Sequence, residues 1–150
     1  MFFSKKIVVR IEPTLKLEPT PQKIAFIDGD QDMILNIGAY HKHIKGNGYE
    51  THFVTISSTP NKVKALQNDP KFNVVNLAGL NMAPGKEATD KYIAAYIQKA
   101  VADGYNDIIV VSNDYDFVDI FKMSAQLCDM SKISFKLIAP KPTGRLVNCK

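Results

Sequence analysis

The stretch Asp107-Ile108-Ile109-Val110-Val111-Ser112-Asn113-Asp114 decides the fold class, because an apolar run ends abruptly in small polar and acidic residues. Such a run is typical of a strand that is buried on both faces. A second run, Lys23-Ile24-Ala25-Phe26-Ile27, ends in the same way at Asp28-Gly29-Asp30. The two runs predict parallel strands that carry acidic side chains at their carboxyl ends.

Strands alternate with helices outward from these two runs. The pattern predicts five strands at 23–27, 49–56, 72–77, 107–112 and 133–138, and helices at 32–45, 60–66, 86–103 and 114–128. On the first helix, Ile34, Ile37 and Ile44 lie on roughly one stripe. We therefore expect an α/β protein with a three-layer Rossmann-like fold around a mainly parallel sheet of about five strands. Ligand sites in such folds lie at the carboxyl ends of the strands, where the strand order reverses.

Residues 1–22 differ from the rest of the chain. Residues 6–11, Lys-Ile-Val-Val-Arg-Ile, predict an extra N-terminal strand, and the prolines that follow predict a linker. We divide the chain into this segment and one domain at 23–150. An isolated strand of this kind either pairs across a homodimer or covers a sheet edge.

Composition sets the broad class of the protein. The chain has 150 residues, 45% of them hydrophobic and 23% charged, as expected for one compact domain. No apolar run approaches the ~20 residues that a membrane span needs, and the first residues lack the order of a secretory signal. Two cysteines, Cys128 and Cys149, make neither a disulfide framework nor a zinc cluster, so we expect a cytoplasmic protein.

The acidic residues are concentrated although the chain is basic. Nineteen Lys and Arg against fifteen Asp and Glu give a net charge of +4, which is compatible with a polyanionic partner. Eleven of the fifteen acids are Asp, and six of these form two strings: Asp28, Asp30 and Asp32, then Asp114, Asp116 and Asp119. Both strings lie at carboxyl ends of predicted strands.

Helical spacing adds Asp90 to this group. It lies three residues before Ile93 and seven before Ile97, so it shares the inward face of the helix at 86–103. Lys86 lies four residues before Asp90, on the same face. The sequence therefore predicts that Asp28, Asp90, Asp114 and Asp116 converge at one edge of the sheet.

Converging carboxylates need a compensating cation, and Mg²⁺ or Mn²⁺ is the natural one for oxygen ligands. A metal held by carboxylates lowers the pKa of bound water and neutralises charge on a phosphate, which suits phosphodiester hydrolysis. Each residue also has a structural interpretation. Asp114 is a candidate N-cap, Asp116 compensates a helix dipole, and Lys86 with Asp90 forms a surface pair.

Three motifs resemble the NYN (LabA-like) branch of the PIN-like nuclease superfamily. They are Phe26-Ile27-Asp28-Gly29-Asp30, Gly85-Lys86-Glu87-Ala88-Thr89-Asp90 and, above all, Val110-Val111-Ser112-Asn113-Asp114-Tyr115-Asp116-Phe117. The family pattern is a strand ending in Asp, a Lys-x-x-x-Asp segment that opens a helix, and Ser-Gly-Asp-Ser-Asp-Phe after a strand. The resemblance runs from Lys23 to about Pro140 in element order.

The resemblance implies a metal-dependent endoribonuclease. Asp28, Asp90, Asp114 and Asp116 are then the catalytic carboxylates that hold Mg²⁺ or Mn²⁺, and Lys86 is a catalytic cation that faces the phosphate or orients a carboxylate. Ser112 is a supporting hydroxyl, with Asn113 and Asp30 also in supporting positions. The sequence departs from the family at Gln31, where relatives often have Asn, and at Asn113, which replaces a common Gly.

Substrate contacts are expected from two basic stretches. Lys42 and Lys45 lie near the end of the first helix, and Lys62 and Lys64 lie in the second. A solvated charged face is the alternative for each stretch. Tyr115 either stacks on a base or packs into the protein, and His41, His43 and His52 are expected to be ordinary surface or core residues.

Two other functions remain open from the sequence. The first is a non-catalytic RNA-binding or protein-interaction module on the same fold. The second is a haloacid-dehalogenase-like phosphatase, whose nucleophile is the first Asp of Asp-x-Asp. That class expects Thr or Val two residues after the second Asp, where this chain has Asp32.

Overall fold

The computed structural model describes residues 22–31, 33–56, 63, 68, 70–77, 88–126, 128–139 and 146–149. Several predicted features lie outside these residues: the N-terminal strand, the linker, most of the helix at 60–66, and Lys62, Lys64 and Lys86. Among the described residues, no helix is long and apolar enough to cross a membrane.

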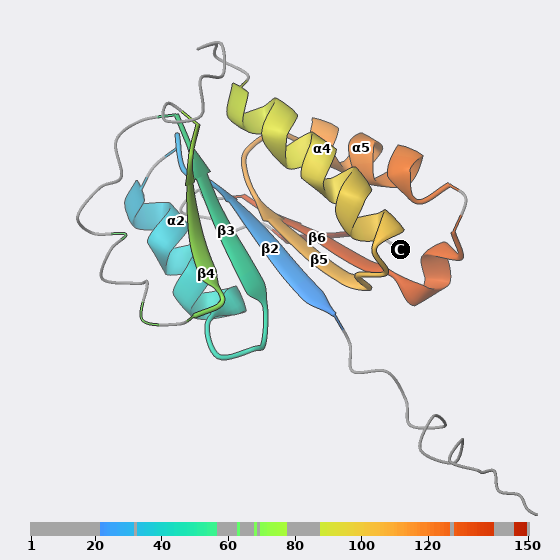
Figure 1. Cartoon of the computed structure of the whole chain (residues 1–150), viewed down its shortest axis with the longest axis horizontal. Coiled ribbons are helices and arrows are strands. Elements are labelled where there is room, and N and C mark those ends of the chain that lie inside the picture. Colours follow the sequence, from blue (N-terminus) through green and yellow to red (C-terminus); the bar gives the residue numbers. More distant parts are fainter. Residues whose placement is uncertain are drawn as a thin grey trace, which may run out of the picture.

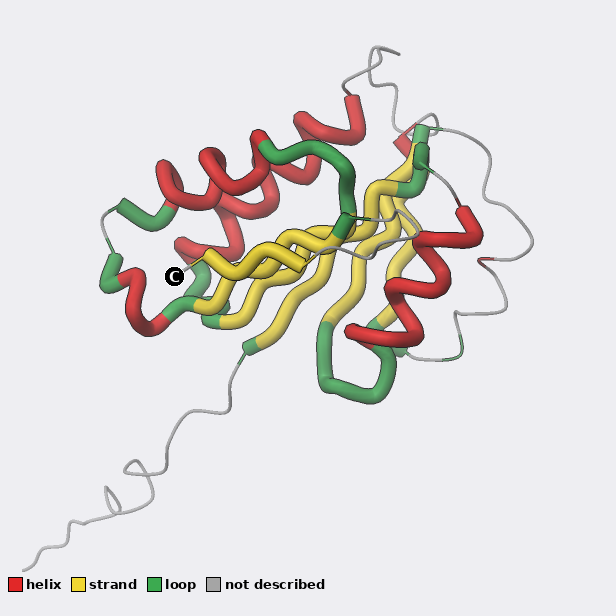
Figure 2. Tube along the Cα trace, turned by 180° about the vertical axis from the view of Figure 1, so that it is seen from behind, coloured by secondary structure: helices red, strands yellow, loops and turns green. Residues whose placement is uncertain are grey.

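The predicted α/β fold class is confirmed. The elements, in chain order, are β2 (Lys23–Asp28), α2 (Met33–Ala39), the π-helical turn η1 (Tyr40–Ile44), β3 (Glu50–Thr55), β4 (Phe72–Asn76), α4 (Ala88–Ala102), β5 (Asp107–Val111), α5 (Asp116–Ser124), the 3-10 turn η3 (Met130–Lys132), β6 (Ser134–Ile138) and β7 (Leu146–Cys149). Helices α4 and α5 cover one face of the sheet and α2 covers the other, which gives three layers (Figure 1, Figure 2).

The strand order is β4-β3-β2-β5-β6-β7. Strands β4, β3, β2, β5 and β6 are parallel, and β7 runs antiparallel to β6. The chain moves outward from β2 to β4 and returns through α4 to β5, so the order reverses between β2 and β5. The expectation that these two strands are neighbours at the reversal is confirmed.

Both faces of the central strands are buried, as their apolar runs predict. In β2, Ile24 and Phe26 pack with α4 and α5, whereas Ala25 and Ile27 pack on the α2 side. The same alternation holds in β5, where Ile108 and Val110 oppose Ile109 and Val111. On α4, the predicted stripe is confirmed, since Ile93 and Ile97 are fully buried.

The stripe predicted for the first helix is wrong at Ile34, which is 69% exposed. The buried positions are instead Asn36, Tyr40 and Ile44, spaced four residues apart. Asn36 turns inward because its Nδ2 donates to the backbone oxygen of Asp28 at 2.8 Å. The π-helical turn then adds a residue, and this turn brings Ile44 into the core beside Tyr40.

The sequence also did not predict β7. Residues 146–149 pair with β6 from Phe135 to Ile138, so the last parallel strand is not the edge of the sheet. Cys149 therefore lies in a strand. Cys128 is free and exposed beyond the end of α5.

The packing of α5 on the sheet generates a first prediction. Phe121 is fully buried, and its ring stacks on Phe135 of β6 with centroids 4.6 Å apart. Phe121→Ala should lower the free energy of unfolding by roughly 3–5 kcal/mol, because it leaves a cavity at the sheet. Met123→Ala, two residues along the same helix but 68% exposed, should change it by less than about 0.5 kcal/mol. Urea unfolding measures both, and equal losses would contradict this packing.

Candidate functional site

Strand pairing brings Asp28 and Ser112 together at the carboxyl edge of the sheet. Asp28 is the last residue of β2, and Ser112 follows β5, in which Val111 pairs with Ile27. Ser112 is fully buried, and its Oγ lies 3.3 Å from Oδ2 of Asp28, to which it donates. The same Oγ accepts a hydrogen bond from the backbone N–H of Asp114 at 3.1 Å. One hydroxyl therefore connects two of the four predicted carboxylate residues, and we call this region the acidic edge: Asp28, Asp30, Ser112 and Asp114.

Asp28 is a buried carboxyl surrounded by like charges. It is 4% exposed, and this burial raises its pKa above the ordinary value of 3.8. Hydrogen bonds from the Asp30 N–H and the Ser112 hydroxyl act in the opposite direction, while the charges of Asp30 and Asp114 raise the pKa further. Folding therefore makes the ionised form of Asp28 less favourable than it is in water.

Asp30 is engaged by three donors from two other elements. Its Oδ1 accepts from Thr55 Oγ1 at 2.8 Å and from the N–H of Ile56 at 3.1 Å, both at the end of β3. Its Oδ2 accepts a short hydrogen bond from Thr89 Oγ1 in the first turn of α4. Asp30 therefore supports the acidic edge by joining the loop after β2 to β3 and to α4.

Asp114 and Asp116 lie on either side of Tyr115, the N-cap residue of α5. Asp114 is half-buried, and its Oδ1 accepts from the N–H of Asp116 at 2.9 Å. Asp116 is exposed in the first turn. Tyr115 between them is 47% exposed, so it does not pack into the core. The N-cap of α5 is Tyr115, one residue after the predicted Asp114, although Asp114 still accepts from the first turn of the helix.

Asp90 lies in the first turn of α4, where it is half-buried next to Thr89. In the described part of the chain, no three His, Cys, Asp or Glu side chains are grouped closely enough to hold a metal ion. The structure links Asp28 and Asp114 through Ser112. That Asp90 and Asp116 converge with them stays a prediction.

Two amide side chains, of Gln31 and Asn36, bond to residues at the acidic edge, and neither was predicted as a site residue. Gln31 donates through Nε2 to Ser112 Oγ at 3.3 Å and accepts through Oε1 from the N–H of Asn113 at 3.0 Å. Asn36, 1% exposed, donates to the backbone oxygen of Asp28, while its Oδ1 has no hydrogen-bond partner among the described residues. The available signal was the four-residue spacing of Asn36, Tyr40 and Ile44, which places a polar residue on the inward face.

Lys42 and Lys45, the two described lysines of those predicted to bind substrate, do not lie at the acidic edge. Helix α2 starts at that edge and runs toward the amino ends of the strands, so Lys42 in η1 lies roughly 13 Å along it from Met33. Lys45 follows in the turn whose Asn47 oxygen accepts from Lys23 Nζ at 3.2 Å, at the start of β2. Both lysines therefore lie at the opposite end of the sheet.

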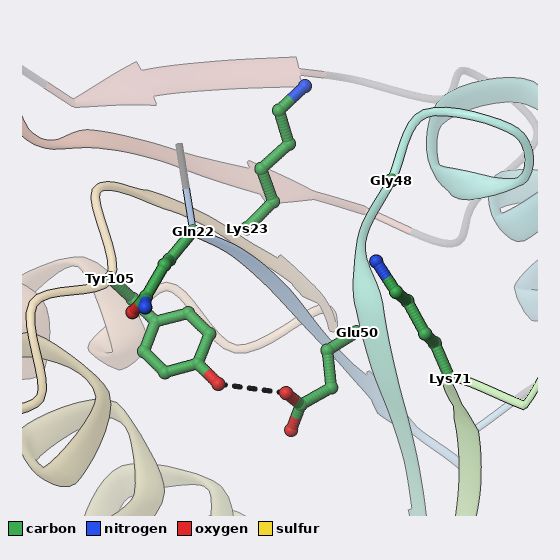
Figure 3. A pocket seen from close by; sticks show the side chains of 6 residues that line it. All are labelled: Gln22, Lys23, Gly48, Glu50, Lys71 and Tyr105. Atoms are coloured by element: carbon green, nitrogen blue, oxygen red, sulfur yellow. Dashed lines mark hydrogen bonds between the residues drawn. The ribbon is translucent and has the colours of Figure 1, made fainter. Parts of the chain in front are cut away.

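A hollow of about 210 Å³ lies at this amino end (Figure 3). It is lined by Gln22, Lys23, Gly48, Glu50, Lys71 and Tyr105. Both oxygens of Glu50 are engaged, one by Tyr105 OH at 2.8 Å and one by His52 Nε2 at 2.6 Å. Burial and the bond to Glu50 raise the pKa of Tyr105 to about 12. His52 is 6% exposed, so of the two expected places, surface or core, it takes the core. Its partner Glu50 is engaged in structural bonds.

No protein-family model matches this chain, and a search of curated proteins finds no match either.

Gly29 generates a prediction because it holds the acidic edge against β3. Its N–H donates to Val54 O at 2.7 Å, and a Cβ on it would lie 2.5 Å from Phe53 Cε1 and 2.8 Å from Val54 O. Gly29→Ala should therefore lower the free energy of unfolding by about 1–3 kcal/mol. Gly38→Ala, where a Cβ meets nothing within 4 Å in α2, should raise it by about 0.5–1 kcal/mol. Chemical denaturation compares the two variants, and a matching sign would contradict this close approach.

The raised pKa of Asp28 generates a third prediction. The native state binds this proton more tightly than the unfolded chain, so the stability that Asp28 contributes falls as pH rises from 3.8 through the native pKa. Free energies of unfolding should be measured across this range, without divalent ions, for the unmodified chain and Asp28→Asn. The variant should gain stability relative to the unmodified chain as pH rises, and then level off. A difference that does not change with pH would contradict the raised pKa.

Proposed function

We propose that the acidic edge binds Mg²⁺ or Mn²⁺ and hydrolyses phosphodiester bonds in RNA, as the resemblance to NYN nucleases implies. The observation that carries the proposal is the burial of Asp28 beside the charges of Asp30 and Asp114. A cation beside Asp28 would compensate these charges, whereas a proton on Asp28 would remove only one of them.

The donors at the acidic edge fit a hard divalent cation. Mg²⁺ is commonly held by one or two carboxylates and keeps several of its waters. Asp28 and Asp114 supply two carboxylates from neighbouring strand ends, joined through Ser112. Asn36 donates to the backbone oxygen of Asp28, and its own buried Oδ1 is a further oxygen that accepts no hydrogen bond within the described part of the chain. Asp90, Asp116 and Lys86 remain the other proposed members of the site.

Each residue has a distinct role in this proposal. Asp28 and Asp114 would hold the cation, which would supply a water of lowered pKa and neutralise charge on the phosphate. Ser112 fixes Asp28 Oδ2 by donating its hydroxyl hydrogen to it. Tyr115, about half exposed between Asp114 and Asp116, offers a ring on which a base of a single strand can stack.

The phosphatase alternative has less support from the geometry. That class expects Thr or Val two residues after the second Asp, where this chain has Asp32. Here both oxygens of Asp30 are occupied by Thr55, the Ile56 N–H and Thr89. Asp30 therefore acts as a structural link between the loop after β2, β3 and α4.

The test is cleavage of RNA and single-stranded DNA, followed on gels, with Mg²⁺, Mn²⁺ or a chelator. We expect RNA cleavage with either metal, none with chelator, and a loss of about 100-fold or more in Asp114→Asn. The amide oxygen in that variant can still accept from the Asp116 N–H, so folding should survive. Asp103→Asn is the matched control, because Asp103 is exposed and pairs with Lys99 at the far end of α4.

Two outcomes would contradict the nuclease proposal. One is full activity in Asp114→Asn. The other is RNA binding that is insensitive to chelator, with no turnover in any divalent ion, and that result would favour the non-catalytic module.

A further inference from the structure

The hydrogen bonds around Ser112 fix where its hydroxyl hydrogen points. A hydroxyl has one hydrogen to donate and two lone pairs that accept. Two N–H donors reach Ser112 Oγ, from Gln31 Nε2 at 3.3 Å and from the Asp114 backbone at 3.1 Å. Because these two donors fill both lone pairs, the hydroxyl hydrogen is left to Asp28 Oδ2 at 3.3 Å.

The orientation of the Gln31 amide is set by a backbone group. The Asn113 N–H can only donate, and it lies 3.0 Å from Oε1 of Gln31. The amide oxygen must face Asn113, so the NH₂ group faces Ser112. The Gln31 side chain, in the loop after β2, therefore hydrogen-bonds to two consecutive residues of the loop after β5, Ser112 and Asn113.

We propose that Gln31 is a positioning residue of the acidic edge. Its amide holds the loop after β5 against the loop after β2 and directs the Ser112 hydroxyl to Asp28, and this sets how Asp28 and Asp114 face a cation. The inference rests on the proposed metal site and names a residue that acts on it without touching the metal. Groups that orient metal ligands in this way typically change metal affinity by 10–100-fold when they are removed.

The first measurement is the affinity for Mn²⁺ alone, by titration calorimetry or by the electron paramagnetic resonance of free Mn²⁺. Gln31→Ala should weaken Mn²⁺ binding about tenfold. Gln98→Ala removes the same amide from an exposed position on α4 and should leave the affinity unchanged. An unchanged affinity in Gln31→Ala, with binding intact in the unmodified chain, would overturn this inference alone.

A double-mutant cycle tests whether Gln31 acts through Ser112. If it does, Gln31→Ala should weaken Mn²⁺ binding much less in a Ser112→Ala background than in the unmodified chain. Equal fold-changes in the two backgrounds would mean that Gln31 acts by another route and would overturn the inference.

Amide hydrogen exchange tests the same contacts without a metal. Gln31→Ala should speed exchange at Asn113 and Asp114 relative to Gln98→Ala, because the grip on this loop is lost. Unchanged exchange would overturn the inference whatever the metal does. Faster exchange in a chain that binds no Mn²⁺ would contradict the proposed function, and would leave Gln31 as a link between loops with no metal ligand to position.

Discussion

The carboxyl edge depends on one constraint: a carboxylate is buried at the point where the strand order reverses. Asp28 is 4% exposed, so its charge has to be stabilised by protein donors. The Asp30 N–H and the Ser112 hydroxyl provide them, from the next turn and from the neighbouring strand. Gly29 lies between, with no room for a side chain against β3. The hydrogen bonds to Asp28 and the close contact at Gly29 therefore determine the path of the loop after β2.

The clustered carboxylates lower the stability of the folded chain, and the proposed cation site is what they would serve. A protein optimised for stability alone would place an amide or an apolar residue at this position, and would not surround Asp28 with Asp30 and Asp114. The charge of Asp30 is accommodated by hydrogen bonds, because its two oxygens accept from donors at the end of β3 and in α4. These bonds join the loop after β2 to both elements. The remaining charge, on Asp28 and Asp114, is what a bound cation would neutralise.

Sequence patterns predicted the sheet because burial on both faces leaves a simple signal. The apolar runs of β2 and β5 and the spacing of Ile93 and Ile97 on α4 all follow from it. The inward face of α2 was predicted wrongly, because its first inward residue, Asn36, is held by a hydrogen bond and not by hydrophobicity.

Other features of the site needed coordinates for a different reason. Asp30 meets Thr55 and Thr89, which are 25 and 59 residues away along the chain. Ser112 was expected to support the site, but the link from Gln31 depends on how two loops meet, which no local pattern encodes. Strand β7 has four residues, too short a stretch for periodicity to identify.

The π-helical turn η1 accommodates one additional residue between α2 and β3. Its defining bond joins the Lys45 N–H to Tyr40 O at 2.8 Å, so the turn holds one residue more than an α-helical turn. A chain lacking that residue would rotate the following positions by about 100° and carry Ile44 away from the core. The additional residue thus works as a spacer. With this residue present, α2 can start beside the acidic edge and Ile44 still reaches the core before the turn at Gly46–Gly48 leads into β3.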